Sequence, residues 1–63
     1  MTNAQKLKSW LKNSGMTQVF FAGKIGVTPD RLRKWMAGDS TPIPHFRQRI
    51  EELTGGEVKA GEW

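Results

Sequence analysis

Apolar positions recur every three or four residues in four stretches of this chain, and glycine, proline and short polar residues separate the stretches. Residues at that spacing lie on one face of an α-helix, so the pattern predicts several short helices that each bury one face. The first helix is expected to begin at Thr2 or Asn3 and to end at about Asn13, before Gly15. Its apolar face consists of Ala4, Leu7 and Leu11.

Residues 17–38 are the most informative stretch, because they predict a short helix, a glycine corner and a second short helix. Thr17 can cap the first of these helices, since its hydroxyl accepts a bond from a free amide of the first turn. Gly26 then ends that helix. The run Thr28-Pro29-Asp30 starts the second helix with a capping hydroxyl, a proline at the first helical position and an acid in the first turn. This helix is expected to cover residues 28–37, and Gly38 ends it.

The second helix has two distinct faces when its residues are placed at about 100° each. The apolar face consists of Leu32, Trp35 and Met36. The opposite face is charged, with Asp30 and Lys34 at its centre and Arg31 and Arg33 on its flanks. Two short helices, a glycine corner and a basic outer face are the form of a helix-turn-helix unit.

This stretch resembles the Cro/lambda-repressor-like family of helix-turn-helix proteins, also called the Xre type. The matching features are Thr17-Gln18, Ala22 five residues after the threonine, Gly26-Val27 at the corner, Leu32, Trp35 and Gly38. Val19, Phe20 and Gly23 depart from the family pattern. The resemblance implies an all-α fold, a compact lambda-repressor-like domain of four to five helices, and a DNA-binding function.

A last helix is expected from about Pro44 to Leu53, and Thr54-Gly55-Gly56 ends it. Its buried stripe is predicted to consist of Ile43, Phe46, Ile50 and Leu53. We expect residues 1–56 to form the helix-turn-helix domain and residues 57–63 to form an extended or irregular C-terminal tail. The predicted core comprises Leu7, Leu11, Phe21, Ala22, Ile25, Val27, Leu32, Trp35, Met36, Phe46, Ile50 and Leu53.

Length and composition narrow the function classes. Sixty-three residues allow one domain with a small core, and the absence of cysteine excludes disulfides and thiolate metal sites. No apolar run approaches a membrane span or the core of a signal peptide, so a cytoplasmic protein without membrane contact is the default expectation. Residues 1–50 hold nine of the ten Lys and Arg and two of the six acids, a net charge of +7. A basic body suggests a polyanionic partner, although small proteins often carry a solvated basic surface.

Catalytic chemistry has little support in the sequence. His45 is the only histidine, and it follows a proline at a helix start. Glu51 and Glu52 are adjacent, so on a helix they point about 100° apart and do not form a facing pair. No metal-ligand spacing and no phosphate-binding glycine loop are present. We therefore expect neither an enzyme nor a bound cofactor or metal.

DNA recognition has a concrete mechanism, because the major groove admits one α-helix whose first residues reach the base edges. Lys34 could bond guanine, while Arg31 and Arg33 could do the same or bind phosphate from the flanks. Asp30 could accept from a cytosine amino group, or it could be a helix-start acid favoured by the macrodipole. Pro29 removes a side-chain donor and leaves the base contact at its position open.

The remaining predicted contacts go to the DNA backbone. The resemblance implies that Gln18 contacts the backbone, and an amide can donate to a phosphate oxygen. Thr28 can cap its helix, contact the backbone, or do both. The loop after the second helix offers hydroxyls to phosphate. The predicted DNA-binding residues are Thr17, Gln18, Thr28, Pro29, Asp30, Arg31, Arg33, Lys34, Ser40 and Thr41.

The leading hypothesis is a sequence-specific transcriptional regulator, most simply a Cro-like repressor that binds a palindromic operator in double-stranded DNA as a homodimer. An alternative is an antitoxin-like or other protein-interaction module with accessory DNA binding, and a third is a non-specific architectural DNA binder. The second hypothesis is motivated by a surplus of apolar residues, Trp10, Phe20, Val58 and Trp63, beside an acidic C-terminal end. We expect Phe20 to be covered, either by the tail with Val58 and Trp63 or by a second subunit.

Overall fold

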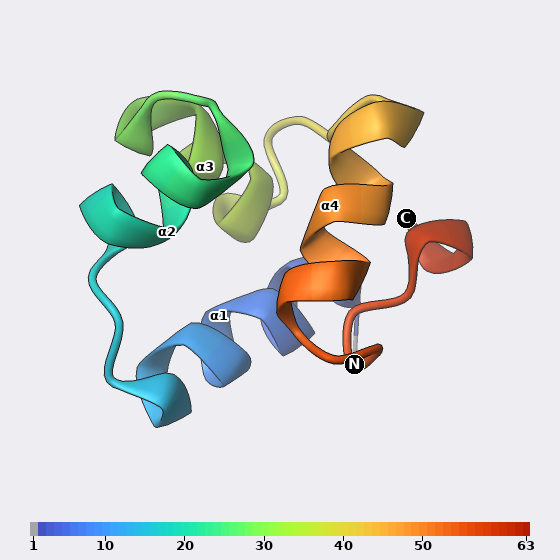
Figure 1. Ribbon diagram of the computed structural model, residues 1–63. Coiled ribbons are helices and arrows are strands. Elements are labelled where there is room, and N and C mark those ends of the chain that lie inside the picture. The colour runs from blue at the N-terminus through green and yellow to red at the C-terminus, as the bar shows by residue number, and fades with distance from the viewer. Residues whose placement is uncertain (1) are drawn as a thin grey trace.

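The computed structural model describes residues 2–63 and folds them into four α-helices and a short 3-10 helix (Figure 1). The helices are α1 (Asn3–Ser14), α2 (Gln18–Ile25), α3 (Pro29–Ala37) and α4 (Pro44–Leu53), followed by η1 (Ala60–Glu62). The predicted all-α class, the number of α-helices and their order are therefore confirmed.

Local capping explains where the first three helices begin and end. Each is preceded by a threonine whose side chain accepts a hydrogen bond from a main-chain amide of the first turn, and these caps are Thr2, Thr17 and Thr28. At the corner between α2 and α3, Gly26 has φ +96°, a left-handed backbone conformation that residues other than glycine rarely adopt. The predicted helix, glycine corner and second helix are thus confirmed.

The core lies where α3 packs against both α1 and α2, and α4 completes it by packing against α2 and η1. Its fully packed members are Leu7, Leu11, Phe21, Ala22, Ile25, Leu32, Trp35, Met36, Ile50 and Val58. All but Val58 were predicted, and the remaining predicted members, Val27, Phe46 and Leu53, are partly buried against this cluster. Burying one large aliphatic side chain contributes about 1.5–3 kcal/mol, so this cluster is what fixes α3 in place.

Ile43 corrects the predicted stripe of the last helix. It was expected to be buried with Phe46, but 59% of its surface is exposed. The reason is that Ile43 precedes α4 with an extended backbone, so helical spacing does not reach it. Its neighbour Pro42 is fully buried instead, and the Pro42 carbonyl accepts a 2.6 Å bond from Arg47 Nε.

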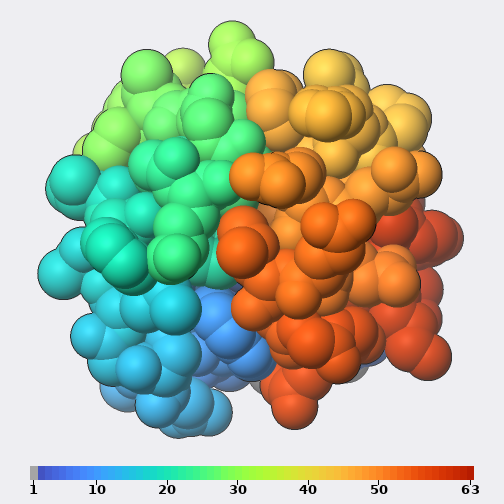
Figure 2. All heavy atoms as spheres, viewed as in Figure 1, coloured from blue at the N-terminus to red at the C-terminus, as the bar shows by residue number. Residues whose placement is uncertain are grey.

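Residues 57–63 turn back onto the domain, which corrects the expectation of an extended tail. Val58 is fully buried in the core, and its main-chain amide donates to the Thr54 hydroxyl over 3.2 Å. That hydroxyl in turn donates to the Ile50 carbonyl over 2.8 Å. Trp63 also packs against the core cluster. The space-filling view shows this end of the chain, in red, lying directly beside α4 (Figure 2).

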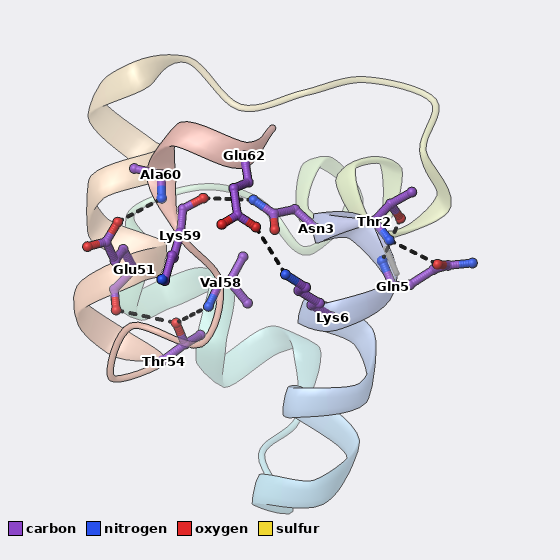
Figure 3. A network of polar contacts seen from close by, with 10 residues as sticks. All are labelled: Thr2, Asn3, Gln5, Lys6, Glu51, Thr54, Val58, Lys59, Ala60 and Glu62. Atoms are coloured by element: carbon purple, nitrogen blue, oxygen red, sulfur yellow. Dashed lines mark hydrogen bonds and ion pairs between the residues drawn. The ribbon is translucent and has the colours of Figure 1, made fainter.

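Polar contacts join the last residues of the chain to α1 and to α4 (Figure 3). The Asn3 side-chain amide donates to the Lys59 carbonyl over 2.7 Å, which links the start of α1 to the C-terminal segment. On the other side, the Glu51 carboxylate accepts from the Ala60 amide over 2.7 Å. The C-terminal segment therefore connects α1 with α4.

The C-terminal segment does not cover Phe20, so the first of the two expected covers is wrong, and cover by a second subunit stays a prediction. Val58 and Trp63 are occupied by the core, whereas 54% of the Phe20 surface and 68% of the Val19 surface are exposed. The Lys24 ammonium lies 5.0 Å from the centre of the Phe20 ring and screens it in part. No helix in residues 2–63 is long and apolar enough to cross a membrane.

Candidate nucleic-acid interface

The orientation of α3 is fixed because the inner face of the helix is buried in the core. Leu32, Trp35 and Met36 are buried against α1 and α2, so rotation of α3 about its axis would expose them to water. Thr28 fixes the start of the helix by accepting a 3.2 Å bond from the Arg31 amide, and Pro29 occupies the first helical position. The predicted outward residues are all exposed: Asp30, Arg31, Arg33 and Lys34.

The charges on this face are paired around one acid. Asp30 accepts from the Arg33 guanidinium through Oδ1, and the Lys34 ammonium lies 3.6 Å from Oδ2. Arg31 makes no ion pair within residues 2–63. The outer face of α3 therefore presents one unpaired cation and a three-membered charge cluster.

The loop that follows α3 lies against one flank of this face. Arg31 and Lys34 line a shallow depression of about 430 Å³ together with Ser40 and Thr41. Both hydroxyl residues are exposed, so the predicted loop contacts do come together with the predicted base-reading residues. Ile43 lines the same depression, and sequence reasoning missed it because the helical pattern placed it in the core.

The start of α2 lies against the opposite flank. Gln18 begins α2 and lines a smaller hollow of about 160 Å³ with Arg33 of α3 and Lys8 of α1. Thr17 caps α2 by accepting a 3.1 Å bond from the Phe20 amide, which leaves its hydroxyl proton free to be donated. Three helices thus place an amide and two cations around one concave spot.

Lys8 is a candidate contact that sequence reasoning did not select. Its position off the apolar stripe of α1 indicated only that it faces solvent. The packing of α1 against α3 is what brings it beside Gln18 and Arg33. A concave surface of this composition can hold one phosphate oxygen by hydrogen bonds and charge.

Shared hollows and ion pairs join seven of the ten predicted residues, and the other three, Thr17, Thr28 and Pro29, adjoin them at the starts of α2 and α3. All of them are exposed, and shared depressions or ion pairs connect the Gln18 flank through Arg33 and Asp30 to the Arg31 flank. This arrangement combines positively charged flanks with polar side chains on an exposed helix face. It suits contact with a duplex, where flanking phosphates position a helix and base edges are read by its first turns.

Other chemical groups are dispersed over the described part of the chain. His45 is exposed, and its ring packs edge-on with the neighbouring Phe46 ring, with 5.4 Å between the two ring centres. Within residues 2–63, no three His, Cys, Asp or Glu residues are grouped so that they could hold a metal ion.

Comparison with known proteins adds a family assignment to this geometry. The Helix-turn-helix family matches residues 7–57, a span that begins within α1 and continues beyond α4. It includes every residue predicted to contact DNA and the neighbouring Lys8. No curated protein and no solved structure shows a significant match.

Proposed function

Because the chain belongs to the helix-turn-helix family of the Xre/Cro type, a family of DNA-binding transcriptional regulators, we propose that it is a sequence-specific, Cro-like repressor. In this proposal α3 enters the major groove of a palindromic operator, and a second copy of the chain binds the other half of the site. Bound protein then blocks access to the promoter.

The observation that carries this proposal is the exposed polar face of a helix whose other face is locked in the core. A helix that reads DNA must present the same side chains in the same direction each time, because base contacts are directional. Arg31 and Lys34 project from such a face beside a hydroxyl-bearing loop. Either cation can bond guanine O6 and N7.

Candidate phosphate-binding residues on both flanks support the same orientation. On one flank, Lys8, Gln18 and Arg33 form the concave spot described above, and on the other flank lie Ser40 and Thr41. Such contacts position the protein without reading sequence. The two flanks lie on either side of α3, as two strands of backbone lie on either side of a major groove.

A dimer is proposed because one domain of this size contacts only a few base pairs. Two-fold related recognition helices about 34 Å apart reach successive major grooves on one side of the duplex. The operator is then expected to contain two inverted half-sites. Sedimentation of the protein with and without operator DNA measures whether two copies bind.

The direct test compares DNA affinity between variants that each lose one positive charge. Arg31→Ala and Lys34→Ala should weaken operator binding, and losing one bidentate base contact costs about 1–3 kcal/mol. Lys59→Ala is the matched control, because Lys59 is exposed in the C-terminal segment and its side chain makes no ion pair in the described chain. All three variants should unfold at the wild-type temperature. Equal affinity of all three for the operator would refute the proposed binding face.

The second candidate function, an antitoxin-like or other protein-interaction module, is favoured by the exposed Val19 and Phe20. Val58 and Trp63 no longer support it, since both pack within the domain. Salt dependence separates the two functions: DNA binding through several phosphates weakens steeply as salt rises, whereas an apolar protein interface does not. A non-specific architectural binder would show the salt dependence without sequence preference.

A further inference from the structure

We propose that Asp30 is a specificity-determining residue of the DNA-binding face. In the free protein its carboxylate holds Arg33 and Lys34. When the protein binds DNA, Arg33 and Lys34 leave the Asp30 carboxylate. The loss of these partners costs little free energy only where a base amino group takes their place as hydrogen-bond donor to the carboxylate. This inference rests on the proposed function and assigns a role to the one acid on a surface of cations.

The position of Asp30 makes this role distinct from general surface charge. It lies in the first turn of α3, where side chains come closest to base edges in a bound groove. Only one other acid, Asp39, occurs among residues 1–50, which hold nine cations. A carboxylate is therefore placed at the centre of the surface that must approach a polyanion.

Asp30 is not needed as the cap of α3, and its contacts, which support the helix as pairs at i,i+3 and i,i+4, also tie it to the cations of the outer face. The start of α3 is already capped by Thr28, which accepts the Arg31 amide. Each carboxylate oxygen of Asp30 is instead turned to a side-chain cation, Oδ1 to Arg33 and Oδ2 to Lys34. The structure thus shows an acid that is engaged with the DNA-facing cations rather than with the helix amides.

The effect of this cluster on the binding free energy depends on the DNA sequence. Phosphates compete with Asp30 for Arg33 and Lys34, and the pairs break readily because all three side chains are exposed. Once its cations are withdrawn, the carboxylate faces the groove without a partner, and acceptors such as guanine O6 or thymine O4 repel it. The amino group of cytosine or adenine donates to it and removes that penalty. Asp30 therefore disfavours wrong sites more than it favours the right one.

The test measures the affinity of wild type and Asp30→Asn for a selected operator and for a random duplex, over a series of salt concentrations. Asparagine keeps the size of the side chain, and its amide can pair with either donors or acceptors. We expect the affinity of Asp30→Asn for random DNA to rise, and the ratio of operator to random affinity to fall about tenfold, the size of losing discrimination at one base pair. The salt dependence on random DNA should steepen by about one phosphate contact.

Asp39→Asn is the matched control, because it removes the same charge from a residue that makes no ion pair in the described chain. It should raise both affinities together and leave their ratio unchanged. The inference is overturned if Asp30→Asn also leaves the ratio unchanged, and a lowered unfolding temperature with that result would identify Asp30 as a helix-start acid only. If the wild-type protein prefers no duplex, the proposed function and this inference are overturned together. If the wild-type protein is selective and Asp30→Asn keeps the same ratio of operator to random affinity, the inference alone is overturned.

Discussion

Replacing Val58 by alanine should destabilise the protein as strongly as a substitution in the centre of its core, although only five residues follow Val58 in the sequence. Its side chain is 0% exposed and belongs to the same cluster as Leu7 and Ile50. The substitution removes two carbon atoms, each worth about 0.8 kcal/mol on transfer, and leaves a cavity that adds to the loss. We therefore expect a loss of about 2 kcal/mol in the free energy of unfolding.

Val19→Ala is the matched control, because it removes the same atoms from a side chain that is 68% exposed. Exposed substitutions change stability by less than about 0.5 kcal/mol, and alanine is the better helix former in α2. For a domain of this size, 2 kcal/mol corresponds to about 8–16 °C in the unfolding temperature. Thermal and urea unfolding followed by circular dichroism measure both variants. If Val58→Ala unfolds at the wild-type midpoint, residues 57–63 do not dock on the domain in solution and the reasoning is refuted.

Three further substitutions probe other contacts. Thr28→Ala should lower the free energy of unfolding by about 1 kcal/mol through loss of the α3 cap. Thr28→Ser keeps the hydroxyl and should retain the wild-type stability. Equal urea midpoints for the two variants would contradict the capping role. Lys8→Ala should weaken operator and random DNA alike and reduce the salt dependence by about one phosphate contact, and a change in sequence preference would argue against a phosphate role. The Lys6 ammonium donates a 3.0 Å bond to Glu62 and thereby lowers the pKa of that carboxyl. The stabilisation from this pair is present at neutral pH and is lost as the pH falls below the ordinary glutamate pKa and through the folded value. Glu62→Gln should therefore unfold at a slightly lower urea concentration than wild type at pH 7, and this difference should shrink as the pH falls through the acidic range; a difference that does not change with pH would contradict the ion pair.

The parts of the fold that depend on local chemistry could be predicted from the sequence. Threonine caps and glycine ends fix the boundaries of α1, α2 and α3 within a few residues of chain, so these helices needed no tertiary information. The outward face of α3 followed in the same way, because helical spacing separates Leu32 and Trp35 from Arg31 and Lys34.

The parts that depend on contacts between distant segments could not be predicted. Val58 follows two glycines in a polar stretch, and only its docking between α1 and α4 makes it a core residue. Ile43 fits a helical stripe in sequence, yet the extended backbone before α4 turns it outward. Lys8 joins the candidate DNA surface only because α1 packs against α3.

The central claim, that α3 reads DNA as one half of a two-fold complex, is tested most directly by selecting duplexes from a random pool at near-physiological salt. The account predicts that two inverted half-sites separated by about one helical turn are enriched. Within each half-site, the recovered base pairs should change when Arg31 or Lys34 is replaced by alanine. Enrichment of no sequence, or of a site that the alanine variants select unchanged, would contradict the claim.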